Sequence, residues 1–164
     1  MKKILLLFVL TITFSACEKD DICTEDTTPR LIVEFYDISN SANLKDVLDL
    51  KVKADGADDF IVFDSTLDVD DPDRYLFNGN KLELPLQLDE NSTVYHLTLN
   101  SNSTSNANED ILQFNYTPEN VFVSRACGYK TIFTLDANPN GVVQTDATLP
   151  ESFWIRSFTI LTTN

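Results

Sequence analysis

The sequence predicts an all-β protein, folded as one antiparallel β-sandwich domain with an immunoglobulin-like or jelly-roll outline. Two observations carry this prediction. Short segments in which apolar and polar residues alternate recur along the chain, with turn residues between them. No amphipathic stretch of helical length interrupts the pattern. About eight or nine short strands separated by turns are typical of sandwiches and barrels.

The first half of the chain is expected to begin the sandwich with residues 31–36 as a strand. In the next strand, alternation with charged residues places four side chains on the core face, namely Leu48, Leu50, Val52 and Ala54. We expect a turn at 55–59, a short buried strand at 60–63 and a loop over 64–80.

The second half continues the alternation with Leu82, Leu84 and Leu86, where Pro85 indicates an edge strand or a bulge. Turns are expected at 117–120 and 138–141, and a flexible polar loop at 100–108. The remaining expected strands are 95–99, 112–116, 121–127, 129–135 and 153–162, the last with Trp154, Phe158 and Ile160 on one side.

The N-terminus has the order of a secretory signal. A basic start is followed by apolar residues 4–14 and by small residues before Cys17. The apolar run is about 11 residues, and a bilayer-spanning helix needs roughly 20. Residues 14–17 resemble a bacterial lipobox, whose cysteine is lipidated and becomes the first mature residue, although Phe14 stands where Leu is usual. The other interpretation is an ordinary signal peptide with an incidental cysteine.

The lipobox resemblance implies a signal peptide over 1–16 and a lipidated tether over 17–29. The strand pattern and the remaining length predict a single β-sandwich domain over 30–164. Acyl chains such as palmitate on Cys17 would anchor the protein to a membrane. Lys19, Asp20 and Asp21 follow Cys17 as in an export signal of lipoproteins from one Gram-negative phylum. That resemblance implies a lipid-anchored protein at the outer membrane, exposed on the cell surface. A solvated polar tether would have the same composition.

Charge excludes one class of partner. The chain has 12 Lys and Arg against 26 Asp and Glu, and removal of residues 1–16 leaves ten against 26, a net charge of −16. A protein this acidic is repelled by phosphate, so nucleic acid is excluded as a partner. Anionic lipid headgroups repel it as well.

Lipidation of Cys17 leaves Cys23 and Cys127 as a pair in an oxidising compartment, where a disulfide is the default. Two buried free thiols are the alternative. Only residues 18–22 lie between the lipid and Cys23, and the extended chain reaches about 20 Å over this distance. A bridge would therefore hold the end of the domain that carries Cys127 close to the membrane.

Catalytic chemistry has little support in the sequence. His96 is the sole histidine, and the strand pattern places it on the solvent face, opposite Tyr95 and Leu97. Acidic pairs are too common to single out a glycosidase pair, and no glycine-rich phosphate loop occurs. We therefore expect no enzyme, no catalytic residue and no cofactor. Arg125 is interpreted as a partner of local carboxylates or carbonyls rather than as a site residue.

Two weaker patterns concern metal binding and modification. An acidic stretch offers oxygen ligands for calcium but lacks the glycine and the final glutamate of an EF-hand, so an acidic surface loop is preferred. Two triplets, 26–28 and 64–66, resemble acceptors of bacterial O-glycosylation, at Thr27 and Ser65. The weak metal candidates are Asp68, Asp70, Asp71 and Asp73.

Residues 122–130, which include Ser-Arg-Ala-Cys-Gly-Tyr, together with residues 84–86 and the Cys17…Cys23 start, resemble an uncharacterised family of Gram-negative lipoproteins. The resemblance implies a small secreted lipoprotein that carries a domain of unknown function. It implies no activity. The expected function is a non-enzymatic envelope lipoprotein with an unknown protein or glycan partner. The alternatives are a surface module that binds glycan or peptide and, less favoured, a hydrolase.

Overall fold

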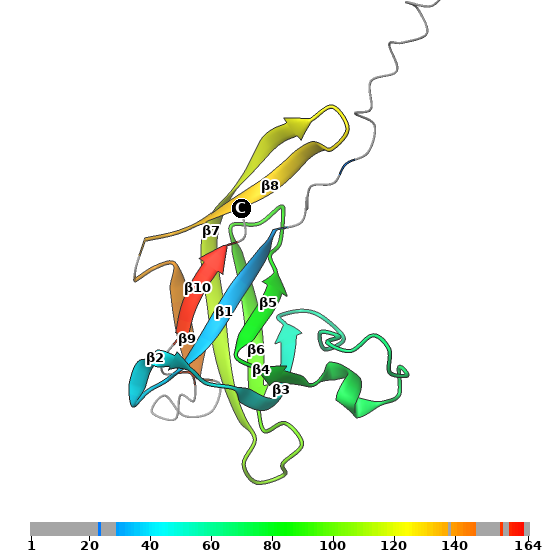
Figure 1. Cartoon of the computed structure of the whole chain (residues 1–164), viewed down its shortest axis with the longest axis vertical. Helices are drawn as coiled ribbons and strands as arrows, with labels where there is room; N and C mark the ends of the chain where they lie inside the picture. Colours follow the sequence, from blue (N-terminus) through cyan, green and yellow to red (C-terminus); the bar gives the residue numbers. More distant parts are fainter. Residues whose placement is uncertain (1–22, 24–28, 138, 147–154, 156–157, 163–164) are drawn as a thin grey trace, which may run out of the picture.

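The computed structural model describes residues 23, 29–137, 139–146, 155 and 158–162. Two antiparallel sheets pack together, and the single short helix among these residues is the 3₁₀ helix η1 (Pro72–Tyr75). Figure 1 shows this arrangement, with one hairpin extending past the sandwich. The predicted all-β sandwich is confirmed.

The smaller sheet is built around β1 (Arg30–Asp37). Its two edges pair with β5 (Lys81–Pro85) and β10 (Phe158–Thr162), and its end pairs with β2 (Asn40–Leu44). β5 pairs with β1 alone, and Pro85 is its last residue. Pro85 therefore lies on an edge strand, as its missing N–H predicts.

The larger sheet has the order β4–β3–β6–β7–β8, with β9 also paired to β7. Strand β7 is 17 residues long, and its first half pairs with β6 and β9, while its second half pairs with β8. The strands of this sheet are β3 (Val47–Ala54), β4 (Phe77–Gly79), β6 (Ser92–Leu99), β7 (Asn108–Ser124), β8 (Gly128–Leu135) and β9 (Val142–Asp146).

Strands β8 and β9 lie along the same edge of β7. Asn115 donates its N–H to the carbonyl of Gly141 (2.9 Å) and accepts from the N–H of Asp136 (3.0 Å). Both main-chain groups of one strand residue point to the same side. β8 and β9 are therefore two parts of one partner of β7, separated in the chain between Leu135 and Val142.

The core lies between the sheets and is almost entirely apolar. One face of each main strand enters it, which is the alternation that the sequence displays. Ring pairs such as Tyr95–Phe114 and Tyr116–Phe133 fill its centre. The largest fully buried apolar side chains are Leu31, Val33, Leu50, Val52, Leu82, Leu84, Tyr95, Leu97, Leu112, Phe114 and Tyr116.

Two buried tyrosines of the larger sheet form hydrogen bonds with the end of β5 and the residues that follow it. The Tyr95 hydroxyl donates to the carbonyl of Pro85, and the Tyr116 hydroxyl donates to the carbonyl of Gln87 at 2.9 Å. The Tyr116 oxygen also lies 2.6 Å from the hydroxyl of Thr93. Burial raises the pKa of both tyrosines, because the phenolate would lose its hydration.

A buried carboxylate holds the chain near its C-terminal end. Asp110, on β7, accepts the N–H of Ile155 at 2.9 Å and the side-chain amide of Gln144 at 3.0 Å. The same Gln144 amide donates to the carbonyl of Ile155 at 2.9 Å. Asp110 thus links β7, β9 and the chain ahead of β10.

The predicted register of β3 is wrong at its start. Leu48 is 59% exposed, and Val47 lies in the core instead. Asp49 has a φ of 50°, and the pairing with β4 shifts between Val47 and Leu50. This bulge adds one residue, which moves every earlier side chain to the opposite face.

Residues 60–63 do not form the predicted buried strand. Phe60 and Val62 are exposed, while Ile61 and Phe63 pack against the core. The ammonium groups of Lys51 and Lys53 lie 5.6 and 5.9 Å from the centre of the Phe60 ring. These two cation–π contacts lie on the outer side of the run, so its side chains alternate between solvent and core without forming a strand.

The predicted turn at 117–120 is also wrong, because β7 continues through it. The N–H of Tyr116 faces away from β8 and bonds to the carbonyl of Asn91 at 2.9 Å. The nitrogen of Pro118, two residues later, faces the same side as the Tyr116 N–H. β6 begins opposite Asn115, so it does not extend to Pro118 on that side. An edge position needs no N–H, and Pro118 is therefore tolerated within the strand.

Three short strands were not predicted, namely β2, β4 and β9. β2 is exposed at every residue, so it has no alternation to detect. The last predicted strand is observed as β10, which begins at Phe158; Trp154 lies outside the described residues.

Candidate functional site

The predicted disulfide is confirmed, and it lies at the tip of the β7–β8 hairpin. Cys127 is in the turn between Ser124 and Gly128, and it is bonded to Cys23 with a Cα–Cα distance of 4.8 Å. The turn is fixed by a hydrogen bond from the Cys127 N–H to the Ser124 hydroxyl, 3.0 Å long. The alternative of two free thiols is wrong for this structure.

The hairpin extends beyond the sandwich at one end of the molecule (Figure 1). Its paired residues run from Tyr116–Leu135 to Ser124–Gly128. At a rise of about 3.4 Å per residue, the eight steps along β7 cover about 27 Å. The disulfide therefore joins the N-terminal part of the chain to a point well away from the core.

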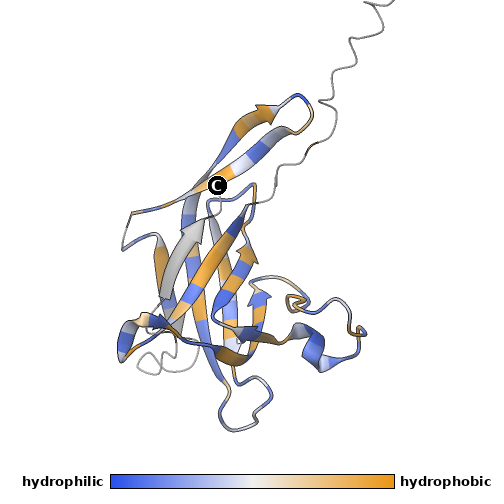
Figure 2. Cartoon of the chain, in the orientation of Figure 1, coloured by the Kyte–Doolittle hydropathy of each residue, from blue (hydrophilic) through white to orange (hydrophobic). Residues whose placement is uncertain are grey.

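An aromatic pair lies on this hairpin next to the turn. Phe122 and Tyr129 are opposite each other across the strands, with ring centres 5.4 Å apart in a T-shaped arrangement. Their exposed fractions are 60% and 68%. Figure 2 shows an apolar stretch at the end of β7, near the hairpin tip.

The charge of the hairpin differs from that of the rest of the chain. Between residues 120 and 135 there are two basic residues, Arg125 and Lys130, and no acidic one. Arg125 is exposed in the turn and makes no hydrogen bond or ion pair with any residue that the structure describes. Its interpretation as a partner of local carboxylates or carbonyls stays a prediction, because the acidic residues on either side of Cys23 in the sequence lie outside the described residues.

Sequence reasoning found Cys127 but missed the aromatic pair. Phe122 and Tyr129 are recognisable as a pair only when the register of β7 and β8 is known. The sequence did contain one signal, an apolar run at 121–123 close to Cys127. An apolar run in a two-stranded hairpin is exposed, because no second sheet covers it.

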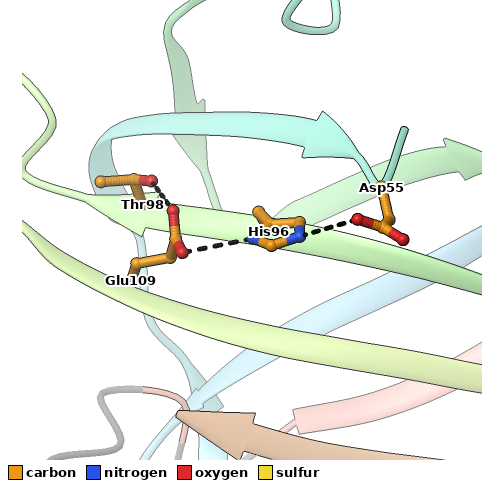
Figure 3. Close-up of polar contacts among 4 residues, drawn as sticks. All are labelled: Asp55, His96, Thr98 and Glu109. Atoms are coloured by element: carbon orange, nitrogen blue, oxygen red, sulfur yellow. Dashed lines mark hydrogen bonds and ion pairs between the residues drawn. The ribbon is translucent and has the colours of Figure 1, made fainter. Parts of the chain in front are cut away.

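His96 lies on the outward face of β6, between two carboxylates (Figure 3). Its Nδ1 is 3.2 Å from Glu109 and its Nε2 is 3.5 Å from Asp55. The side chain is 30% exposed. The nearby hydroxyl of Thr98 donates to Glu109 at 3.4 Å and not to His96, so no hydroxyl nucleophile is paired with the imidazole here.

An open cleft of about 460 Å³ lies at the end of the sandwich away from the hairpin. Its lining combines apolar side chains, including Phe35 and Leu48, with the charged side chains of Lys45 and Asp46. A second cleft of about 520 Å³ is more polar and includes Arg30 and Glu83. The residues around His96 line neither of them.

The four aspartates of the acidic loop are not gathered into a cation cage. Asp71 caps η1 by accepting the N–H of Asp73 at 2.9 Å, and the side chains of Asp68, Asp70 and Asp73 are exposed. In the part of the chain that the structure describes, no group of three or more His, Cys, Asp and Glu is placed to hold a metal ion.

Ser65 is exposed in the loop ahead of η1, where a modifying enzyme would have access to it. The neighbouring Asp64 accepts the hydroxyl of Thr66 at 2.5 Å and its N–H at 2.9 Å. These hydrogen bonds hold the pKa of Asp64 below its ordinary value. The other predicted sites in the N-terminal part lie outside the described residues: Cys17, Lys19, Asp20, Asp21 and Thr27.

The fold and its hairpin define a small all-β domain whose disulfide joins the N-terminal part of the chain to a hairpin tip. Residues 49–160 match a family of unknown function, DUF6452, and the chain belongs to this family. No curated protein and no solved structure matches the chain. Among the described residues, no helix has the length and apolar character needed to cross a membrane.

Proposed function

We propose that this protein is a lipid-anchored, non-enzymatic component of a bacterial cell envelope. Acyl chains on Cys17 attach it to the outer membrane after export. The observation that carries the proposal is the Cys23–Cys127 disulfide in a chain that begins with the pattern of a lipoprotein signal. Disulfides persist in exported proteins and are rare in the cytosol, so the bridge supports the export reading of residues 1–16.

The lipid anchor is tested by Cys17→Ser in the full chain. The native protein is expected in the membrane fraction, with an intact mass that includes acyl chains, whereas the variant is expected in the soluble fraction without them. Cys23→Ser serves as the control, since it removes a cysteine of the same region and leaves the lipidation site intact. A Cys17→Ser protein that still sediments with membranes would contradict the proposal.

Surface exposure is the finer part of the proposal, and it depends on Lys19, Asp20 and Asp21. Protease treatment of intact cells is expected to degrade the native protein. A variant with alanine at these three positions is expected to keep its lipid and to be protected. Full protection of the native protein would place it on the periplasmic leaflet and would remove the surface assignment.

The non-enzymatic part is supported by the surroundings of His96. Both ring nitrogens face carboxylates on an outward sheet face, and the two described clefts lie elsewhere. Such a pair of contacts is what a surface histidine makes in an acidic protein.

A second candidate function is binding of a glycan or peptide, which the open cleft of about 460 Å³ favours. Clefts of this size with apolar walls and a few polar groups suit small ligands. The test is saturation-transfer NMR with short oligosaccharides and apolar peptides. Leu48→Glu is the matched variant, because this exposed side chain lines the cleft without supporting the core. Signals that are absent, or unchanged in the variant, would contradict this candidate.

A further inference from the structure

We propose that the tip of the β7–β8 hairpin, residues 121–130, inserts Phe122 and Tyr129 into the interfacial layer of the bilayer that holds Cys17. This inference rests on the proposed lipidation of Cys17 and adds a second, non-covalent contact with the same membrane. It assigns a role to the exposed aromatic pair, which the fold of the sandwich does not use.

The length of the chain between Cys17 and Cys23 limits how far the hairpin can lie from the membrane. Five residues separate Cys17 from Cys23, and a fully extended chain covers about 20 Å over this interval. Cys23 is bonded to Cys127, in the turn of the hairpin. A lipidated Cys17 therefore keeps the hairpin tip within about 20 Å of the bilayer surface, while the rest of the sandwich has no such constraint.

The exposed side chains at the hairpin tip are of the kinds found at membrane interfaces. Tyrosine and other aromatic side chains favour the boundary between lipid and water, because one part of the side chain is apolar and another is polar. Phe122 and Tyr129 are both more than half exposed and lie side by side. Arg125 and Lys130, on the same segment, can reach lipid phosphate with the charged ends of flexible side chains.

The charge of the hairpin also differs from the charge of the rest of the protein. The mature protein carries a net charge of −16 and is repelled by anionic headgroups. The acids nearest to the tip along the two strands are Glu119 and Asp136. Glu119 is five residues from Ser124, about 17 Å at 3.4 Å per residue, which is about two Debye lengths at physiological ionic strength. Within the hairpin the tip is therefore basic and aromatic, and the acids closer to it belong to the tether, where Glu18, Asp20 and Asp21 accompany Lys19.

Another account of the aromatic pair needs no membrane. Cross-strand aromatic contacts stabilise a hairpin in water. That account predicts no contact of either ring with lipid, so a measurement of lipid contact separates the two.

The test uses the full-length, lipidated protein in vesicles of phosphatidylethanolamine and phosphatidylglycerol with brominated acyl chains. Tyr129→Trp places a fluorophore at the tip, and Phe122→Trp repeats the measurement from the opposite strand. Leu48→Trp is the control, at an exposed apolar position at the other end of the sandwich. The native chain, which keeps Trp154, provides the background to subtract.

We expect loss of emission and a blue shift for tryptophan at positions 129 and 122, and neither change for position 48. Quenching by bromine requires contact with the acyl chains, so a tip that is merely near the membrane gives none. Flotation of the vesicles measures the anchor separately. A protein that floats without quenching at 129 and 122 overturns this inference alone, whereas one that does not float overturns the proposed anchor as well.

One further outcome would assign the surface to a different partner. If the tip is unquenched and a photo-crosslinker at position 129 captures an envelope protein in intact cells, the membrane assignment is wrong and the aromatic pair is a protein contact.

Discussion

Strand β7 belongs to two regions that are stabilised in different ways. Up to Tyr116 it lies between β6 and β9, and one face of it is buried at every second residue, from Asp110 to Tyr116. Beyond Tyr116 the same strand pairs with β8 alone, and Phe122 is exposed. The sandwich body is held by its core, whereas the hairpin is held by ladder hydrogen bonds and one disulfide.

The disulfide lies where the hairpin lacks other support. A two-stranded hairpin without a packed face is marginally stable in water. Phe133 is the last fully buried side chain of β8 in the direction of the turn. The Cys23–Cys127 bond ties the tip to a second part of the chain at the point where core packing no longer contributes.

The largest expected effect is in the body. Phe114→Ala removes a fully buried ring that packs against Tyr95. A cavity in the middle of the core is expected to lower the free energy of unfolding by about 3–5 kcal/mol. Urea denaturation followed by far-ultraviolet circular dichroism measures this change. A loss below about 1 kcal/mol would mean that the two sheets are not joined by a common core.

The disulfide is expected to matter next. Replacing both Cys23 and Cys127 with Ser should cost about 2–4 kcal/mol, because the unfolded chain loses the constraint of a closed loop. We expect amides of residues 120–131 to exchange faster with solvent, while those of β6 keep their protection. Equal acceleration in both regions would contradict the separation of hairpin and body.

Loss of the buried carboxylate of Asp110 is expected to have the next largest effect on stability. Asp110→Ala leaves the Ile155 N–H and the Gln144 amide without their acceptor and should cost about 1.5–3 kcal/mol. Asp136→Ala, at an exposed loop position, is the control and is expected to change stability little. Thermal unfolding of the two variants under the same conditions provides the measurement.

Alkaline pH should weaken the body through its buried tyrosines. Burial raises the folded-state pKa of Tyr95 and Tyr116 above the ordinary value near 10, so their contribution to stability is complete below pH ~10. Above that pH the unfolded state loses its protons first, so stability is expected to fall with rising pH until the raised folded-state pKa of each tyrosine is passed.

Tyr116→Phe separates this effect from general alkaline instability. The variant should show a shallower decline in stability above pH ~10, whereas Tyr129→Phe, at an exposed position, should leave the decline unchanged. Identical slopes in all three proteins would exclude the Tyr116 hydroxyl as a cause.

The smallest expected effect is at the hairpin. Phe122→Ala removes an exposed ring and its contact with Tyr129, which is worth about 0.2–1 kcal/mol in a cross-strand pair. Far-ultraviolet denaturation curves should barely change. A loss comparable with that of Phe114→Ala would show that the hairpin and the core unfold as one packed unit.

The sandwich was predictable because burial of one sheet face leaves a period of two in the sequence. That pattern identified β1, β5, β6 and the first half of β7, and cysteine parity identified the pair Cys23 and Cys127. The failures have specific causes. A bulge at Asp49 reversed the faces of Val47 and Leu48, and Pro118 sits on an edge where its missing N–H has no cost.

The candidate membrane contact was less accessible from sequence. Phe122 and Tyr129 became a pair only through the register of β7 and β8, and an apolar run at 121–123 is compatible with a core strand until its exposure is known. In contrast, the lipobox resemblance depends on four consecutive residues, 14–17, and needs no tertiary structure to be noticed.

Hydrogen exchange, followed by mass spectrometry, tests most directly whether the hairpin is the part of this protein that meets the membrane. The native lipidated chain on vesicles is compared with the Cys17→Ser chain in solution. The account predicts protection by the membrane confined to peptides that cover residues 120–131, with the sandwich body unchanged. Protection of the body instead of the hairpin, or no difference between the two forms, would contradict it.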